Sequence, residues 1–245
     1  MKPIHLLLCL PLIIFACNDD DDIMPVEPDP NPPTDPATPT DTINFLALGD
    51  SYTIGTAVSA AERWPVLLAD ALTEAGANDT AYTTNVDIVA TNGWTTRNLI
   101  NGINARTDLR DDYELVSLLI GVNNQFQGLP LAQYRTEFVQ LLDRAVAFAG
   151  GNAGRVFVVS IPDYAFTGVG NGSQSISDGV MQFNAAAKEL TEARGLPFLN
   201  ITRISQQGLD DPSLVATDNL HPSGKQYQRW VDEVIEARVR VILGE

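Results

Sequence analysis

Five short apolar segments alternate with longer amphipathic segments from residue 43 to the end of the chain. The apolar segments occupy residues 43–48, 86–90, 115–120, 155–161 and 197–201. The segments with helical spacing of apolar residues occupy 61–75, 95–105, 134–149, 176–194 and 224–243. The third apolar segment, LVSLLI, has one polar position, which is typical of a strand covered on both faces. The alternation predicts an α/β fold with a parallel five-stranded sheet between two layers of helices.

The motif GDSYTIG, residues 49–55, stands directly after the first of these strands. Open parallel sheets build their sites in the crevice outside the carboxyl ends of the strands. Gly49 permits a sharp exit from the strand, which places Asp50 and Ser51 at that crevice. A serine there can act as a nucleophile if a base reaches it. Because Asp and Ser also cap helices and close turns, the motif alone leaves both interpretations open.

The first 17 residues predict a signal peptide. Lys2 supplies a positive start, and the apolar core at 6–15 is too short to span a bilayer. The ending IFAC resembles a bacterial lipobox, in which the cysteine, here Cys17, becomes the lipid-modified first residue of the mature protein. The alternative is an ordinary signal peptide with a chance cysteine. We expect an exported bacterial lipoprotein that is anchored to a membrane, at the outer membrane or the cell surface.

Residues 18–42 have the composition of a disordered tether. They are rich in proline, aspartate and threonine and contain too few apolar residues to bury a core. Their prolines favour an extended spacer. They hold eight of the 31 acidic residues and none of the 15 basic ones, which is half of the formal net charge of −16. A single folded domain is therefore predicted at 43–245.

The charge and the cysteine content exclude several classes of function. An acidic domain does not suit nucleic acid or an anionic membrane surface, so membrane contact is expected through the lipid anchor only. Both cysteines, Cys9 and Cys17, lie in the signal and lipobox, which leaves the mature domain without a disulfide or thiolate site. Once His5 is removed with the signal, one histidine remains, a poor basis for a zinc site. We expect no metal and no cofactor.

Four short blocks follow strands or precede the last helix. They are GDSYTIG at 49–55, NGWTT at 92–96, GVNN at 121–124 and DNLHP at 218–222. In order and content these blocks resemble the SGNH (GDSL) hydrolases, a family named for the Ser, Gly, Asn and His that they carry. The resemblance covers essentially all of 43–245. It implies a flavodoxin-like three-layer α/β/α sandwich and a lipase-like esterase activity with a serine nucleophile.

The resemblance also implies a role for each block residue. Ser51 is the nucleophile, His221 the general base and Asp218 the carboxylate that orients the imidazole. The oxyanion hole consists of the backbone N–H groups of Ser51 and Gly93 and the side-chain amide of Asn123. In the flavodoxin-like strand order 2-1-3-4-5, the segments after strands one, two and three reach one crevice. His221 is the one imidazole that the mature domain can offer as a base.

The chain departs from the family pattern at two positions. The third block commonly reads Gly-x-Asn-Asp, and here Asn124 replaces the aspartate. Tyr52 stands where leucine is usual. Asp50 is expected to support the loop and to take no part in the chemistry. We expect the change at Asn124 to affect the geometry around the site more than the activity.

Several further residues are candidates for substrate contact. Phe126, Tyr164 and Phe166 are candidates for an acyl pocket, with ordinary packing as the alternative for each ring. Trp94 is a candidate neighbour of the oxyanion hole, and Asn124 is a further candidate for binding. The long, glycine-rich connection at 163–177 (DYAFTGVGNGSQSIS) is typical of a lid or a binding segment.

These interpretations predict a serine esterase that cleaves acyl esters through a Ser-His-Asp triad and an acyl-enzyme. The expected substrate is a small ester or an acylated glycan or lipid. One alternative is a carbohydrate O-acetyl esterase or an acyltransferase that uses the same residues. A non-catalytic surface lipoprotein that keeps the fold for binding is a further alternative, which the intact set of site residues disfavours.

Overall fold

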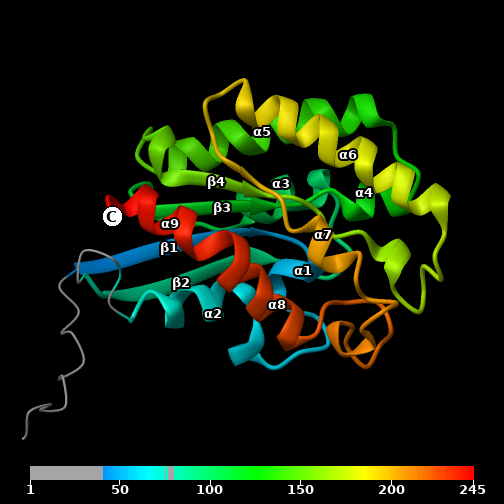
Figure 1. Cartoon of the computed structure of the whole chain (residues 1–245). Helices are drawn as coiled ribbons and strands as arrows, with labels where there is room; N and C mark the ends of the chain where they lie inside the picture. Colours follow the sequence, from blue (N-terminus) through cyan, green and yellow to red (C-terminus); the bar gives the residue numbers. More distant parts are fainter. Residues whose placement is uncertain (1–40, 75, 77–79) are drawn as a thin grey trace, which may run out of the picture. The chain divides into compact units, whose positions relative to one another are not determined.

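The computed structural model describes residues 41–74, 76 and 80–245, and in this part of the chain five parallel strands form one sheet (Figure 1). The strands are β1 (Asp41–Gly49), β2 (Tyr82–Ala90), β3 (Leu115–Leu119), β4 (Val156–Val159) and β5 (Phe198–Leu199). Their order is β2-β1-β3-β4-β5, which confirms the predicted α/β fold and strand order. The predicted signal peptide and nearly all of the predicted tether lie outside the described residues, so these two predictions stay predictions.

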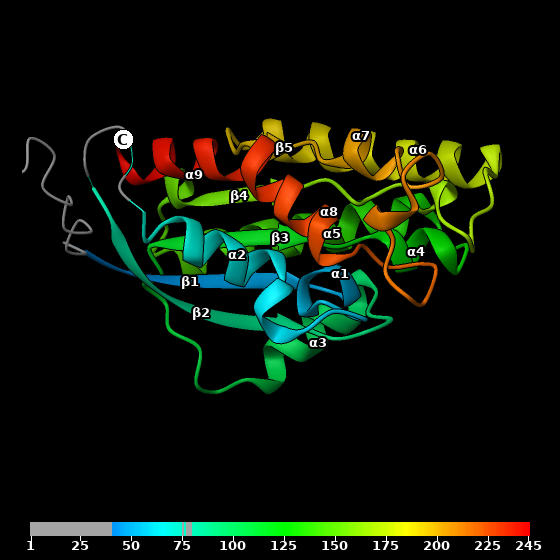
Figure 2. The ribbon, with the colours of Figure 1, turned by 60° about the horizontal axis from the view of Figure 1, so that its bottom comes forward.

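Helices cover both faces of the sheet. They are α1 (Ser51–Ile54), α2 (Trp64–Ala71), α3 (Thr96–Ala105), α4 (Val122–Phe126), α5 (Leu131–Phe148), α6 (Gln174–Glu192), α7 (Thr202–Ser205), α8 (Gly224–Trp230) and α9 (Glu236–Leu243). Helices α3, α5 and α6 pack side by side on one face, and α2, α8 and α9 cover the other (Figures 1 and 2). Short 3₁₀ turns at Ala60–Glu62, Ala153–Arg155, Tyr164–Phe166 and Pro212–Leu214 connect these elements.

A cluster of aromatic rings fills the core on each side of the sheet. Phe45 on β1 lies between Trp64 and Phe157, with ring centroids 6.0 and 6.3 Å away. On the other side, Tyr134 packs against Phe183 at 4.8 Å. All five side chains are buried. Burial on both faces explains why the central strands read as almost continuous apolar runs in the sequence.

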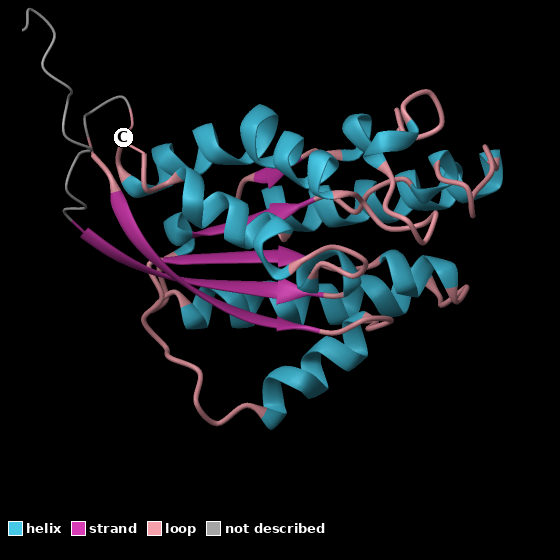
Figure 3. Ribbon diagram, turned by 90° about the horizontal axis from the view of Figure 1, so that it is seen from below, coloured by secondary structure: helices cyan, strands magenta, loops and turns pink. Residues whose placement is uncertain are grey.

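All the strands point in the same direction, so their carboxyl ends form one edge of the sheet (Figure 3). The register aligns Gly49 with Ala90 of β2 and with Leu119 of β3. The segments that leave these three strands therefore start side by side. β1 begins with Asp41 at the opposite edge of the sheet, remote from Ser51.

The structure differs from the sequence prediction at several element boundaries. β1 and β2 are longer than predicted, because they pair with each other over nine residues, from Asp41–Tyr82 to Gly49–Ala90. The predicted helix at 224–243 is divided by a π-helical segment, Val231–Ile235, between α8 and α9. The predicted helix at 61–75 is shortened to α2, because Pro65 in its first turn favours a start there.

Among the described residues, no helix combines the length and the apolar character that a membrane crossing needs.

Candidate active site

The segment after β1 turns sharply into the short helix α1. Gly49 is required at this turn, because a Cβ there would lie 2.7 Å from the carbonyl oxygen of Leu119. Asp50 caps the helix, since its Oδ1 accepts a hydrogen bond from the backbone N–H of Tyr52 at 3.0 Å. Ser51 is therefore the first residue of α1, and the turn holds it at the carboxyl edge of the sheet.

The carboxyl group of Asp50 is fully buried beneath this turn. Its Oδ2 has no hydrogen-bond partner among the described residues. Burial raises the pKa of Asp50 to about 7, although the hydrogen bond from the backbone N–H of Tyr52 acts in the opposite direction. This geometry suits a residue that shapes the turn, as expected from the sequence.

The loop before α8 holds the only histidine of the described residues against a carboxylate. Asp218 Oδ2 lies 2.6 Å from Nδ1 of His221. Asp218 Oδ1 accepts two backbone hydrogen bonds, from Leu220 and His221, each at 3.0 Å. Burial tends to raise the pKa of Asp218, but the bonds from the His221 ring and the two backbone N–H groups outweigh it and lower this pKa. A carboxylate only accepts, so Nδ1 donates and Nε2 is left as an acceptor.

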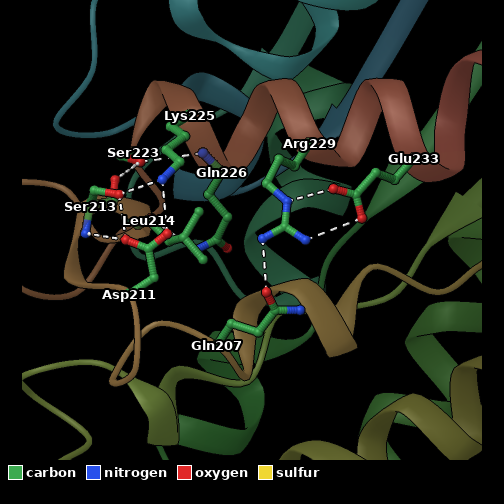
Figure 4. A network of polar contacts seen from close by, with 9 residues as sticks. All are labelled: Gln207, Asp211, Ser213, Leu214, Ser223, Lys225, Gln226, Arg229 and Glu233. Atoms are coloured by element: carbon green, nitrogen blue, oxygen red, sulfur yellow. Dashed lines mark hydrogen bonds and ion pairs between the residues drawn. The ribbon is translucent and has the colours of Figure 1, made fainter.

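A polar network fastens this loop to α8 (Figure 4). The buried Gln226 donates from Nε2 to the carbonyl oxygen of Leu214 at 2.9 Å. Lys225 bonds to Asp211 Oδ2 at 2.8 Å, at the start of the loop. Within the loop, the backbone N–H of Ala216 donates to the carbonyl oxygen of His221 at 2.7 Å. These contacts fix the histidine on the rigid helix layer, although it lies in a loop.

A cavity of about 200 Å³ opens at the carboxyl edge of the sheet. Its walls are formed by Ser51, Tyr52, Asn92, Val122, Asn123, Phe126, Tyr164, Leu220 and His221. The structure thus brings together five of the residues predicted for the site. They are Ser51, Asn123, Phe126, Tyr164 and His221. Asp218 lies behind the histidine. Ser51 and His221 line the same cavity, and hydrogen bonds between catalytic groups are often loose before substrate is present.

Of the three predicted oxyanion donors, Ser51 and Asn123 line this cavity, and Gly93 is adjacent to it in sequence but is not one of the lining residues. Within the described residues, the backbone N–H groups of Ser51 and Gly93 have no acceptor. Gly93 has a φ of +80°, in the left-handed region that favours glycine, and it is the neighbour of the cavity residue Asn92. Asn123 donates from Nδ2 to the carbonyl oxygen of Trp94 at 2.9 Å, which leaves its second N–H free to act in the cavity.

Three residues predicted for substrate contact do not line this cavity. The ring of Trp94 packs on Gly102 of α3, where an added Cβ would lie 2.2 Å from it. Asn124 is fully buried, and its amide group binds Thr96. Phe166 is half-buried in the 3₁₀ turn after β4. Phe126 and Tyr164 therefore remain as the predicted aromatic wall, with ring centroids 6.1 Å apart.

The connection at 163–177 is tied into the core and does not form an open lid. Asp163 is fully buried, and its Oδ1 accepts the backbone N–H of Ala165 at 3.1 Å. Its Oδ2 accepts hydrogen bonds from Ser177 at 2.5 Å and from Gln206 at 3.2 Å. Both ends of the connection are thereby fixed to one carboxylate. The segment contributes to the site through the cavity wall at Tyr164.

Four cavity residues were missed as site residues in the sequence, and each is next to a predicted one. Asn92, Val122 and Leu220 precede or separate motif residues, and no local pattern marks their side chains as cavity walls. Tyr52 packs its ring edge-on against His221, with centroids 5.6 Å apart. The position of Tyr52 next to Ser51 is the sequence feature that could have indicated this contact, because a large ring there can cover an imidazole.

In the part of the chain that the structure describes, no three His, Cys, Asp or Glu side chains lie close enough to hold a metal ion.

Comparisons of the sequence and of the fold with known proteins indicate the same family. A sequence model of the GDSL-like lipase/acylhydrolase family matches residues 47–229. Among solved structures, the chain is similar to the esterase EstA from Pseudoalteromonas sp., with 18% identity, a TM-score of 0.61, and coverage of 82% of this chain and 99% of that one. It is also similar to a lipase/acylhydrolase from Enterococcus faecalis, with 18% identity, a TM-score of 0.62, and coverage of 82% and 96%.

An acetyl xylan esterase variant from Geobacillus stearothermophilus is similar as well, with 17% identity, a TM-score of 0.61, and coverage of 80% of this chain and 94% of that one. At these identities the likeness shows a shared fold. A search of curated proteins finds no match to the chain.

Proposed function

The chain belongs to the GDSL-like lipase/acylhydrolase family and is a hydrolase, and we propose that it is a serine esterase that works through an acyl-enzyme on Ser51. The observation that carries this proposal is the cavity in which Ser51 and His221 share one wall, with Asp218 bound to the far nitrogen of the imidazole. Family membership favours an enzyme over the non-catalytic surface lipoprotein considered from the sequence.

In the proposed reaction, Ser51 Oγ attacks the ester carbonyl carbon and His221 Nε2 takes the hydroxyl proton. The carbonyl π electrons move onto the oxygen, which the N–H groups of Ser51, Gly93 and Asn123 stabilise. The intermediate then expels the alcohol, which receives the proton from Nε2. A water molecule repeats the sequence on the acyl-enzyme and releases the carboxylic acid. Asp218 keeps the ring in the required tautomer throughout.

The cavity walls support an acyl group as the portion of the substrate that is bound there. Val122, Phe126, Tyr164 and Leu220 present mainly apolar surface, which suits a hydrocarbon chain. We propose small acyl esters as the substrate class. Acetate release from acetylated oligosaccharides, measured beside hydrolysis of p-nitrophenyl esters and acyl transfer to added alcohols, decides between this class and the O-acetyl esterase or acyltransferase alternatives.

Covalent labelling tests the proposed nucleophile. A fluorophosphonate probe is expected to add one phosphonyl group per molecule, on the peptide that contains Ser51, because an activated serine displaces fluoride from phosphorus. The structure of EstA described above is of an enzyme inhibited by monoethylphosphonate. The Ser51→Ala variant should remain unlabelled, and His221→Ala should react far more slowly. Labelling of another serine, or none in the folded protein, would overturn the proposal.

The lipid anchor is a separate proposal, which rests on the lipobox-like ending at Cys17 and on the acidic, proline-rich residues that follow it. In a bacterial host given a labelled fatty acid, the full chain is expected to carry the label and to sediment with membranes. The Cys17→Ala variant should lose both properties, while its esterase activity stays unchanged. Retention of the label in this variant would place the lipid elsewhere or refute the anchor.

A further inference from the structure

Two consecutive asparagines of α4 join the segment after β3 to the segment after β2. Asn123 donates from Nδ2 to the carbonyl oxygen of Trp94 at 2.9 Å. Asn124 forms a closed pair of bonds with Thr96: its Oδ1 accepts the backbone N–H at 3.0 Å, and its Nδ2 donates to Oγ1 at 2.8 Å. Gly93 immediately precedes the segment that they hold. The spacing between two of the proposed oxyanion donors therefore depends on these bonds.

The hydroxyl group of Thr96 extends this connection to a third element. Its oxygen accepts from Asn124, so its own proton is free to be donated, and it is donated to Oε2 of Glu137 at 2.5 Å. Glu137 lies on α5, which packs beside α3 on the same face of the sheet (Figure 2). The chain of donors thus runs in one direction, from the amide of Asn124 through the hydroxyl group to the carboxylate.

Glu137 is unusual because it is a glutamate at a buried position of a helix. Its side chain is 1% exposed, within the layer between α3 and α5. The other carboxylate oxygen, Oε1, accepts from Arg97 Nε at 3.1 Å and from Gln133 at 3.0 Å. The Arg97 side chain is 54% exposed, so this ion pair is partly solvated and adds little stability. Stability alone is therefore a weak reason for a carboxylate here, whereas a fixed orientation of Thr96 is a specific one.

We propose that Glu137 is a positioning residue for the esterase reaction, which acts through Thr96 and Asn124 to hold the Gly93 and Asn123 donors at the separation that the oxyanion requires. This inference rests on the proposed function of those two donors. The carboxylate does not touch the substrate, and it lies outside the residues that line the cavity.

The same geometry gives a reason for the asparagine at position 124. An aspartate at this position would accept the Thr96 proton, and the hydroxyl group would then face two carboxylates with one proton to share. The amide of Asn124 supplies a donor on one side of Thr96, and Glu137 supplies the acceptor on the other. We infer that Asn124 and Glu137 are matched as donor and acceptor on the two sides of the Thr96 hydroxyl group. Exchanging the two roles together would therefore preserve both hydrogen bonds.

Reversal of this polarity is the test. Asn124→Asp and Glu137→Gln are each expected to lower kcat for p-nitrophenyl acetate by about tenfold to a hundredfold, because misplaced catalytic groups cost up to about that much. KM should stay within about twofold, since the donors act on the transition state. The double variant Asn124→Asp/Glu137→Gln should recover most of kcat, because the new amide at 137 donates to Thr96 and the new carboxylate at 124 accepts from it.

Three further variants make the result interpretable. Asn123→Ala, which removes a proposed donor, should lose on the order of a hundredfold in kcat and sets the scale. Thr96→Val keeps the shape and removes the hydroxyl group, so it tests the connection if one of the single variants fails to fold. Glu189→Gln breaks the exposed ion pair between Arg135 of α5 and α6, and its kcat should equal that of the wild type.

All rates are measured well below the lowest unfolding temperature of the set, with the native fold checked by near-ultraviolet circular dichroism. Folded single variants with wild-type kcat would overturn the proposal and leave Glu137 a merely structural residue. A double variant as slow as the singles would refute the matched polarity. Failure of the proposed function is distinguishable, because the wild-type protein would then be neither labelled by the fluorophosphonate nor active on the ester.

Discussion

The Asp218→Asn variant is expected to lose about four orders of magnitude in kcat while it keeps its fold. An asparagine retains Oδ1, which can still accept the backbone N–H groups of Leu220 and His221. It presents an N–H group to Nδ1 of His221 in place of the carboxylate oxygen. The imidazole must then carry its proton on Nε2, which faces the cavity and can no longer accept the proton of Ser51.

The measurement is kcat for a p-nitrophenyl ester, together with the rate of fluorophosphonate labelling, which should fall in parallel. Asp210→Asn is the matched control, because it removes one exposed aspartate from the segment that precedes the same loop. A loss of less than tenfold in Asp218→Asn would show that the carboxylate does not set the tautomer of His221, and the proposed triad would have to be revised.

The Asp50→Asn variant is expected to abolish a large pH dependence of stability. The pKa of Asp50 is about 7 in the folded chain against an ordinary value of 3.8. Between these values the folded state binds more protons at this site than the unfolded state, so the free energy of unfolding falls as the pH rises. A shift of about three units corresponds to on the order of 4 kcal/mol by pH 8. An amide resembles the protonated acid in shape and does not ionise.

Denaturant unfolding of both proteins at pH 4 and pH 8 measures this effect. At pH 4 the two proteins should have similar free energies of unfolding, and at pH 8 the variant should be the more stable one. The difference in free energy of unfolding between the two proteins is taken at each pH, and the change in this difference from pH 4 to pH 8 cancels the contribution of all other titrating groups. Asp70→Asn, at an exposed position of α2, should change neither value. A variant that is less stable at pH 8 would show that the ionised carboxylate stabilises the turn.

The central strands could be predicted because burial on both faces leaves a continuous apolar run, as in β3 (LVSLL). The length of β2 was underestimated, since its first residues (YTTN) are partly exposed and polar, on a strand that lies at the edge of the sheet in the described part of the chain. The π-helical segment Val231–Ile235 could not be predicted, because apolar periodicity continues through it and does not record the change in hydrogen bonding.

The site was predictable where its residues lie in short motifs at the ends of strands. Glu137 was not, because it comes 41 residues after Thr96 in a long amphipathic helix, where a glutamate normally faces solvent. The way in which the segment 163–177, predicted as a lid or a binding segment, is held in place could not be predicted from the sequence either. Asp163 ties that segment down through Ser177 and Gln206, and a pattern of glycines and serines does not reveal such a partner.

The position of Asp41 determines where the proposed anchor would join the folded domain. β1 starts there, at the pole of the sheet opposite to the mouth of the cavity. With an anchor at Cys17, as proposed, the folded domain would be attached to the membrane through this pole. The point of attachment would then lie away from the residues that line the cavity and would leave its opening uncovered.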